Sequence, residues 1–247
     1  MWDDRRLAAP TTTSPDPMTA STPSLRRDGD VRVLDLGDGE NRFNPDWLGA
    51  VGALLDEVEA APAPRALVTT GSGKIWSNGL DLDWMGANPD AIPGFVDQVH
   101  DLLARVLVLG VPTVAAIQGH AFAGGAMLAI AHDHRIMRAD RGFICLPEVD
   151  IRIPFSPGMT ELLVARLPVW TSNEALTTGR RYGGTDAAAA RVVDEAVAED
   201  ELLPRAIERA AGLAGKDPAT LAAIKQRLYA RAATALRDRD ANQLRQG

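Results

Sequence analysis

Glu148 follows an apolar run in the stretch CLPEVDIRIP, and its residue type and setting are suited to proton transfer. A carboxyl group in apolar surroundings has a raised pKa and can act as a general base or acid. The alternative is a solvent-facing carboxylate, which is also how Asp150 in the same segment can be interpreted. Both interpretations of Glu148 stay open at this point.

A second candidate is the stretch QGHAFAGGAMLA, in which an apolar strand runs through small residues into a predicted helix. The first N–H groups of a helix lack partners within the helix and carry partial positive charge. Gly124 and Gly125 would let a ligand approach this backbone closely, which suits a developing oxyanion. Alternatively, the two glycines only permit close helix packing.

The stretch KIWSNGLDLDWM, residues 74–85, combines an Asn-Gly pair with two tryptophans and two aspartates. It is either an apolar turn or a loop that brings its backbone to a ligand. An Asn-Gly pair alone indicates only a turn.

Other combinations of residues give weaker indications of a phosphate, metal or nucleophile site. Gly71, Gly73 and Lys74 hint at a phosphate loop, but Ile75 occupies the position of the magnesium-binding Ser or Thr. His132 and His134 are two residues apart and would face apart, so a polar helix end is favoured over a metal site. Ser77 and Ser156 do not lie in a G-x-S-x-G elbow, so a serine nucleophile is not favoured.

The elements that must position these groups alternate between strands and helices. Apolar alternation or runs predict strands over 31–36, 65–70 and 112–119, and in HRIM and GFICL. Helical periodicity predicts helices after Pro45, over 94–109 and 124–134, and through most of the C-terminal part. The chain is therefore expected to have an α/β fold with a helical C-terminal segment.

Composition limits the function classes. The 247 residues are 46% hydrophobic and carry a formal net charge of -7, which gives no indication of a nucleic-acid partner. The single cysteine, Cys145, excludes an intrachain disulfide and a zinc site built on cysteines, and fits a reducing compartment. There is no apolar run of membrane-spanning length and no signal-peptide pattern, so a cytoplasmic location without membrane association is expected.

The chain is expected to divide into three parts. Residues 1–28 are rich in Pro, Thr and Ser and are predicted to be a disordered extension. Residues 29–190 form the predicted core with the site, and residues 191–247 form a C-terminal helical region with a short strand near VVDEAV.

Several motifs together resemble the crotonase (enoyl-CoA hydratase/isomerase) superfamily. They are SNGLDL, QGHAFAGGAMLAIAHDHRI, LPEVDIRI and ALTTGRRYGGTDAAAARVVDEAV, in the family's order and spacing over residues 31–236. The resemblance implies a spiral of β-β-α units and a C-terminal helical trimerisation region, hence a homotrimer or hexamer. It also implies an acyl-CoA thioester as substrate, with no permanently bound cofactor and no metal.

The resemblance also implies site roles. The backbone N–H groups of Leu80 and Gly124 match the oxyanion hole that stabilises a thioester enolate. Glu148 matches one of the two glutamates of the family's hydratases, whereas Met127 occupies the position of the other. Ser156 stands where some family members carry an aspartate.

One carboxylate suits a 1,3-proton shift, and the pattern is similar to monofunctional Δ3,Δ2-enoyl-CoA isomerases. The expected reaction converts a 3-enoyl-CoA into the 2-trans-enoyl-CoA. An enoyl-CoA hydratase or another CoA thioester lyase is one alternative. A catalytically silent CoA-binding protein or structural oligomer is another.

The remaining predictions concern the substrate pocket. Lys74 and Lys225 are the candidates for contacting the CoA phosphates, and arginines such as Arg42 could substitute. The residues predicted to line the acyl and CoA pocket are Trp76, Ser77, Asn78, Gly79, Asp81, Trp84, Met85, Phe122, Gly125, Met127 and Phe155.

Overall fold

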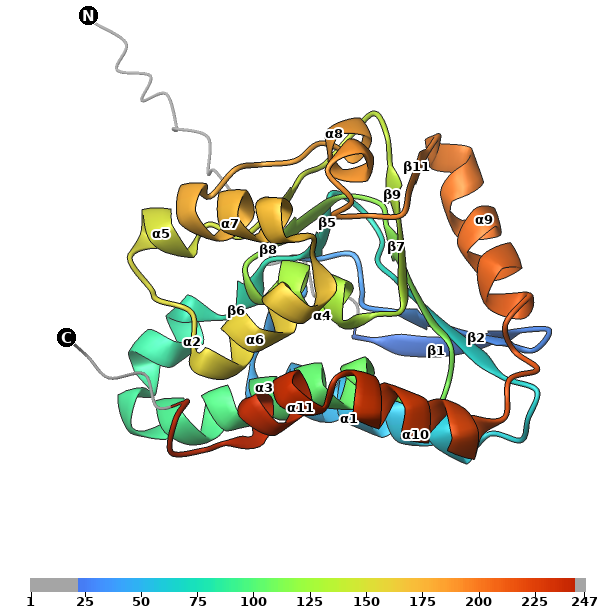
Figure 1. The fold of residues 1–247 in the computed structure, drawn as a ribbon, viewed down its shortest axis with the longest axis horizontal. Coiled ribbons are helices and arrows are strands. Elements are labelled where there is room, and N and C mark those ends of the chain that lie inside the picture. The colour runs from blue at the N-terminus through green and yellow to red at the C-terminus, as the bar shows by residue number, and fades with distance from the viewer. Residues whose placement is uncertain (1–21, 243–247) are drawn as a thin grey trace, which may run out of the picture.

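A six-stranded sheet in the order β1-β2-β4-β7-β9-β11 forms the centre of the fold (Figure 1). The computed structural model describes residues 22–242. Apart from the antiparallel β1–β2 hairpin, neighbouring strands of this sheet are parallel. The strands are β1 (Ser24–Asp28), β2 (Val31–Asp35), β4 (Ala66–Thr70), β7 (Thr113–Ile117), β9 (His134–Arg138) and β11 (Glu195–Val197).

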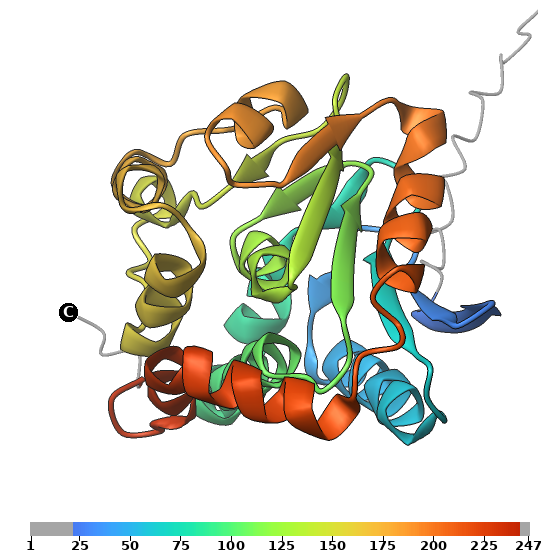
Figure 2. The ribbon, with the colours of Figure 1, turned by 45° about the vertical axis from the view of Figure 1, so that its right-hand side comes forward.

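The middle strands are buried on both faces, as the sequence predicts for apolar strands of a parallel sheet. All five residues of β4 and of β7 are buried. One face is covered by α9 (Glu199–Ala211), whose Leu202, Ala206 and Ala210 pack against it (Figure 2). The opposite face packs against the larger core, which the remaining helices enclose.

Two small sheets lie beside the large one and carry the candidate site. One has the order β10-β8-β5, and the other pairs β3 with β6. The pairing is parallel throughout, with a register shift between β5 and β8. The strands are β3 (Arg42–Phe43), β5 (Ile75–Ser77), β6 (Gly79–Leu80), β8 (His120–Phe122) and β10 (Ile144–Cys145).

Helices follow the strands and enclose the core. α1 begins at Pro45 behind the N-cap Asn44, whose side chain accepts from the Trp47 N–H. This is a favoured start, because Pro at the first turn lacks only an N–H that the helix cannot use. The helices up to α6 are α1 (Pro45–Ala60), α2 (Leu82–Ala87), the 3-10 turn η1 (Pro89–Ala91), α3 (Ile92–Leu107), α4 (Gly124–Ala131), α5 (Glu148–Ile151) and α6 (Pro157–Arg166).

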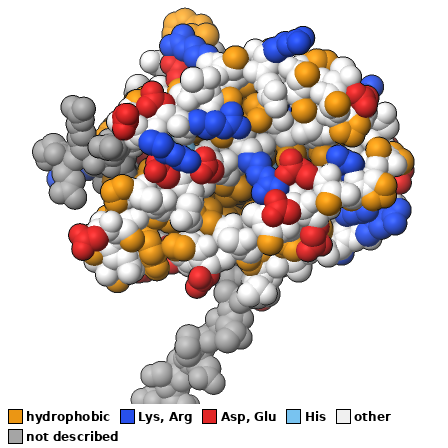
Figure 3. Space-filling view, turned by 90° about the horizontal axis from the view of Figure 1, so that it is seen from below, with side chains coloured by type: hydrophobic (Ala, Val, Ile, Leu, Met, Phe, Trp, Pro, Cys, Tyr) orange, Lys and Arg blue, Asp and Glu red, His pale blue; other side chains and the backbone are white. Residues whose placement is uncertain are grey.

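The C-terminal helices close the lower side of the molecule in Figure 1, where α11 packs against α3 and α6. Arg239, just beyond α11, forms an ion pair with Asp101 of α3 at 2.6 Å. Seen from below, this face carries charges of both signs interspersed with apolar side chains (Figure 3). The helices on this side are α10 (Pro218–Leu228) and α11 (Ala230–Arg237), whereas α7 (Val169–Thr178) and α8 (Gly184–Ala189) lie at the upper side of the view.

The structure corrects the predicted N-terminal boundary. Residues 24–28, placed in the disordered extension, form β1 and pair with β2 through a two-residue turn at Gly29 and Asp30. Gly29 has φ +58°, the conformation that such hairpin turns require. Residues 1–21 of the predicted extension lie outside the described residues. Within residues 22–242, no helix has the length and apolarity needed to cross a membrane.

Candidate active site

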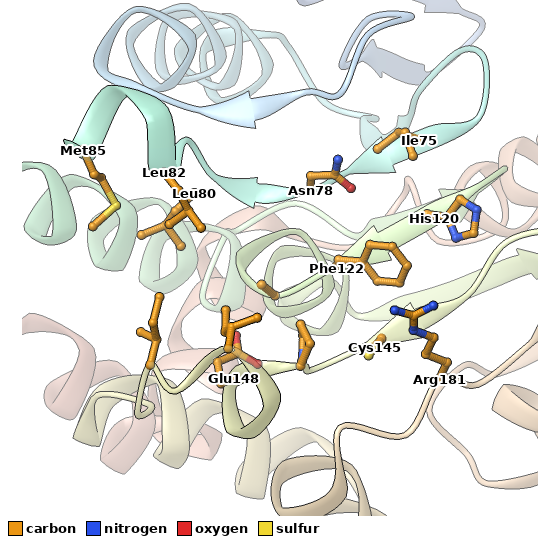
Figure 4. A pocket seen from close by; sticks show the side chains of 14 residues that line it. Ile75, Asn78, Leu80, Leu82, Met85, His120, Phe122, Cys145, Glu148 and Arg181 are labelled. Carbon is orange, nitrogen blue, oxygen red and sulfur yellow. The ribbon is translucent and has the colours of Figure 1, made fainter. Parts of the chain in front are cut away.

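A cavity of about 420 Å³ opens between the β5–β6 segment and the β10–α5 segment (Figure 4). Both segments belong to motifs that the sequence analysis singled out, although residues 75–85 and 145–153 are far apart in the chain. The lining residues are Ile75, Asn78, Leu80, Leu82, Met85, His120, Phe122, Ala123, Cys145, Pro147, Glu148, Ile151, Ile153 and Arg181.

Glu148 is the first residue of α5 and points into the cavity. Its side chain is buried, with 6% of the residue exposed, and its Oε2 has no hydrogen-bond partner among residues 22–242. Burial raises the pKa of the Glu148 carboxyl to about 7, because an apolar setting disfavours the charged form. Glu148 is therefore not the solvent-facing carboxylate that the alternative interpretation described. Asp150 is exposed, as that interpretation predicts for it. A carboxylate with this pKa is suited to accept and return a proton at neutral pH.

The structure brings Leu80, which lines the cavity, together with Gly124. An added Cβ on Gly124 would lie 3.1 Å from Leu80 Cδ1, so β6 packs directly on the start of α4. The Asp81 N–H donates to Phe43 O of β3, and alternate N–H groups of an extended strand point to opposite edges. The Leu80 N–H therefore points away from β3. At Gly124 the N–H is one of the first four in α4, which have no partner within the helix.

Close backbone contacts hold these two segments in place. Gly125 contacts β5 so tightly that an added Cβ would lie 2.3 Å from Ser77 O. Gly79 has φ +75°, and an added Cβ there would lie 2.6 Å from Gly124 N. Ala123 takes a positive φ of 49°, which L side chains rarely adopt, immediately before Gly124. At Gly125 there is no space for a side chain. At Gly79 both the lack of space and the positive φ require glycine.

Some of the predicted pocket residues line the cavity with their side chains, and others shape its wall. Asn78, Met85 and Phe122 belong to the lining. Ser77 is buried, donates to Asn41 O and accepts from the Gly79 N–H, which fixes the turn. The Asp81 carboxylate caps α2 by accepting from the Trp84 N–H.

Two predicted pocket residues are corrected by the structure. Trp76 is fully buried and contacts His132 of the core edge-on, at 6.4 Å between ring centroids. Met127 is 1% exposed, on a helix whose residues are all buried, and is part of the main core. Neither lines the cavity. Trp84 and Phe155 are partly buried and pack against the core, with Trp84 on Phe95.

Lys225 is also corrected, because it does not reach the cavity. It is 3% exposed, and its Nζ lies 2.6 Å from Asp133 Oδ2 and donates to Val111 O. Burial lowers the pKa of Lys225, and the Asp133 carboxylate opposes this effect. Lys225 therefore stabilises the fold instead of meeting a phosphate. Lys74 is exposed at the start of β5, and its role stays a prediction.

We expect Lys225→Met to lower the free energy of unfolding by about 3 kcal/mol, because it leaves Asp133 without its buried cationic partner. Urea unfolding measures this loss, with Lys216→Met at an exposed position as the matched control. The KM for acyl-CoA thioesters is expected to stay unchanged. A raised KM with unchanged stability would restore Lys225 as a phosphate ligand.

The other polar candidates are occupied by structural contacts. His132 is buried between Leu128 O and Thr69 Oγ1, and Asp133 accepts from the Thr113 N–H. Ser156 caps α6 and forms a 2.7 Å hydrogen bond with His100. These contacts agree with the interpretation of residues 132–134 as a polar helix end.

Sequence reasoning missed several lining residues, among them His120, Cys145 and Arg181. His120 lies close to Gly124 in the sequence, but only its pairing in β8 shows which way it points. Arg181 reaches the cavity because the backbone of Tyr182 exchanges two hydrogen bonds with Ile144 of β10. No local pattern in the sequence indicates that pairing.

Comparison with known proteins identifies the family. The family model described as enoyl-CoA hydratase/isomerase matches residues 30–246. Enoyl-CoA delta isomerase 3 of Arabidopsis thaliana is 37% identical over 183 residues, covering 70% of this chain and 76% of that protein. Carnitinyl-CoA dehydratase of Escherichia coli is 36% identical over 209 residues, covering 82% of this chain and 78% of that protein.

Solved structures show the same architecture. A Mycobacterium tuberculosis protein, described as an enoyl-CoA isomerase in one solved structure and as a probable enoyl-CoA hydratase in another, is 30% identical. The first structure superposes with a TM-score of 0.81, covering 88% of this chain and 95% of that one. Human mitochondrial Δ3-Δ2-enoyl-CoA isomerase, at 24% identity, gives a TM-score of 0.81 over 87% and 86% of the two chains. The predicted crotonase-like fold is confirmed, and the chain belongs to the enoyl-CoA hydratase/isomerase family.

Proposed function

We propose that this protein is a Δ3,Δ2-enoyl-CoA isomerase. The observation that carries the proposal is the chemistry of the cavity lining. Among the described residues that line the cavity, Glu148 is the only carboxylate, and it shares the cavity with Leu80, which packs on Gly124 at the start of α4. The relatives named as enoyl-CoA delta isomerases support the same reaction.

The proposed reaction is a proton shift on one base. Glu148 removes a proton from C2 of the 3-enoyl thioester, and the electrons pass to the thioester oxygen to give an enolate. The N–H groups of Leu80 and Gly124 stabilise that oxygen, and one such donor is worth about 3 kcal/mol in the transition state. The enolate collapses as Glu148 returns the proton to C4, which leaves the double bond between C2 and C3.

The similarity to carnitinyl-CoA dehydratase makes hydration or dehydration the second candidate. Adding water across the double bond calls for a group that activates the water and a group that protonates carbon. Glu148 can do one of these, and Met127, at the position of the second glutamate, lies in the core. The isomerase is therefore favoured.

The test is turnover of 3-hexenoyl-CoA, followed by the ultraviolet absorbance of the conjugated product. The isomerase proposal expects 2-trans-hexenoyl-CoA as the product. Hydration of 2-butenoyl-CoA without any isomerisation would favour the second candidate. Binding of both thioesters without turnover of either would indicate a catalytically silent protein.

We expect kcat/KM for 3-hexenoyl-CoA to rise with pH and to level off above about pH 7. The base must be ionised to accept the C2 proton, and burial raises the pKa of Glu148 to about 7. A pH–rate profile over pH 5–9 measures this. A profile that is flat across pH 6–8 would contradict the assignment of Glu148 as the base.

We also propose that the chain assembles as a homotrimer or hexamer in the cytoplasm. Val169 and Trp170 at the start of α7 are 79% and 86% exposed, and exposed aromatic residues are enriched at protein interfaces. Sedimentation velocity tests the assembly, and a stable monomer would contradict it.

Similar proteins include peroxisomal ones, so the location requires its own measurement.

A further inference from the structure

α4 lies wholly inside the protein, so both of its ends must be supported by other parts of the chain. All eight of its residues, Gly124–Ala131, are buried. The last carbonyl groups of a helix have no partner within it, and buried carbonyls require one. At the other end, the N-cap residue Ala123 has no side-chain acceptor and lines the cavity. The N-terminal end of α4 therefore adjoins the cavity, and its C-terminal end depends on its neighbours.

Two arginine side chains hold the C-terminal end of α4. The Nε of Arg166, at the end of α6, donates to Ile130 O at 3.1 Å. Its Nη2 donates to His132 O at 2.6 Å and to Asp133 O at 3.0 Å. From β9, the Nη1 of Arg135 donates to Ile130 O at 3.2 Å and to His132 O at 3.1 Å. Ile130 O and His132 O thus each accept hydrogen bonds from two guanidinium groups.

The second guanidinium is more than pairing requires, because either group alone would satisfy both carbonyls. Arg135 is 5% exposed, and burial together with the charge of Arg166 lowers its pKa to about 10. Arg135 therefore still carries its charge at pH 7, next to a second cation. The partial negative charge at the helix C-terminus offsets the repulsion between the two cations. Because charge-assisted hydrogen bonds are stronger than neutral ones, this end of α4 is held firmly.

Arg166 also connects α4 to the segment that carries Glu148. The chain runs from Glu148 and α5 directly into α6, which packs beside α4 and ends at Arg166 (Figure 1). α4 is only about 12 Å long, at 1.5 Å per residue, and a closely packed helix moves as a unit. A shift at its C-terminal end therefore also moves the Gly124 N–H at its start.

We propose that Arg166 is a positioning residue for the isomerisation: it holds α4 where the Gly124 N–H meets the thioester oxygen while Glu148 reaches the acyl carbons. This inference rests on the proposed function, which supplies the roles of Gly124 and Glu148. Arg135 holds the same carbonyls from the sheet, so without Arg166 α4 stays folded but loses this connection to α6. The guanidinium charge also offsets the negative end of the helix dipole, which favours a developing enolate at the first N–H groups.

Three variants separate positioning from a general loss of stability. Arg166→Met removes the hydrogen bonds and the charge, whereas Arg166→Lys keeps the charge without the planar guanidinium. Arg105→Met is the matched control, because Arg105 is also half-buried and donates to a helix carbonyl, Gly52 O, at 3.1 Å. Arg105 lies on α3, and these partners lie on α1. Urea unfolding measures the stability of each variant.

Two kinds of readout are compared. Kinetics with 3-hexenoyl-CoA gives kcat and KM, and calorimetry gives the affinity for hexanoyl-CoA. The second readout needs no turnover: it is the infrared carbonyl band of hexanoyl-CoA that carries a heavy carbon isotope at the thioester carbonyl. Hydrogen bonds from the oxyanion donors weaken this carbonyl bond, so the wild type is expected to shift the band to lower frequency on binding.

We expect Arg166→Met to lower kcat by about 10- to 100-fold, because a small misplacement caused far from the chemistry can cost that much. KM and the affinity for hexanoyl-CoA are expected to change little, and the carbonyl band is expected to return toward its solution frequency. Arg166→Lys is expected to recover part of kcat and part of the band shift. Arg105→Met is expected to lose stability and to keep both.

Equal losses of kcat in Arg166→Met and Arg105→Met would overturn the inference, because they would show a general effect of lower stability. An unchanged band in a folded Arg166→Met would also overturn it. A wild type that shifts the band but does not turn over 3-hexenoyl-CoA would contradict the proposed function alone, and the band in Arg166→Met would still decide this inference. A wild type that leaves the band at its solution frequency would overturn both.

Discussion

Glu148→Gln is expected to lower turnover of 3-hexenoyl-CoA by about 10²- to 10⁴-fold, the range associated with loss of general acid–base catalysis. Glutamine fills the same space but cannot accept the C2 proton. The affinity for the thioester is expected to change little, because the Leu80 and Gly124 backbone remains in place. Steady-state kinetics and calorimetric binding of hexanoyl-CoA measure the two quantities.

The same substitution is expected to change how stability depends on pH. Burial raises the pKa of Glu148 from 4.5 to about 7, so the folded state favours the protonated carboxyl. The stability that this group contributes is fully present below pH 4.5 and is lost as pH rises through about 7. One pKa unit corresponds to about 1.4 kcal/mol, so the wild type loses roughly 3 kcal/mol over this window and the glutamine variant does not.

Urea unfolding at pH 5 and at pH 8.5 compares the two proteins. Asp150→Asn is the matched control, because Asp150 lies on the same short helix but is exposed. The assignment of Glu148 as a buried base would be contradicted if the free energy of unfolding changed equally with pH in Glu148→Gln and in Asp150→Asn. Retained turnover in Glu148→Gln would contradict it independently.

Gly79→Ala is expected to lower kcat by about 10²- to 10³-fold, as loss of an oxyanion donor does. Its φ of +75° is strained for alanine, and the new methyl group would lie 2.6 Å from Gly124 N. The β6 backbone and the start of α4 must then move apart, which displaces the donors from one another. The strain itself is expected to cost about 1–2 kcal/mol of stability.

Gly86→Ala provides the control for this prediction. Gly86 lies in α2 without a positive φ, and an added Cβ meets no atom within 4 Å. Alanine there favours the helix by up to about 1 kcal/mol. Equal kcat values in the two variants, with both proteins folded by thermal melting, would refute a role for the Gly79 backbone in positioning the oxyanion donors.

The elements of the fold could be predicted well where the sequence carries a local pattern. The strands at 31–35, 66–70 and 113–117 follow from apolar residues between turn signals, and α1 follows from Asn44, Pro45 and its apolar periodicity. β1 was missed, because its exposed polar residues resemble the extension before it. The Gly29-Asp30 pair is the turn signal that could have identified it.

The candidate site could be predicted only in part. Family motifs identify Glu148, Leu80 and Gly124, but the direction of a side chain depends on tertiary pairing. Trp76 follows the lining residue Ile75 in β5, and successive side chains alternate, so Trp76 turns into the core. Arg181 could not be assigned, because its position depends on a bridge between residues distant in the chain.

The proposed catalytic groups and the six-stranded sheet occupy separate parts of the architecture. The cavity is lined mainly from strands and helices of two to six residues, whereas the large sheet and α9 bury a second core. Exposed lining residues such as Leu82 and Ile151 can be exchanged at small cost to the melting temperature. Substitutions in the cavity lining can therefore change which thioesters bind without altering the residues of the buried core. This separation makes the chain a practical starting point for directed evolution.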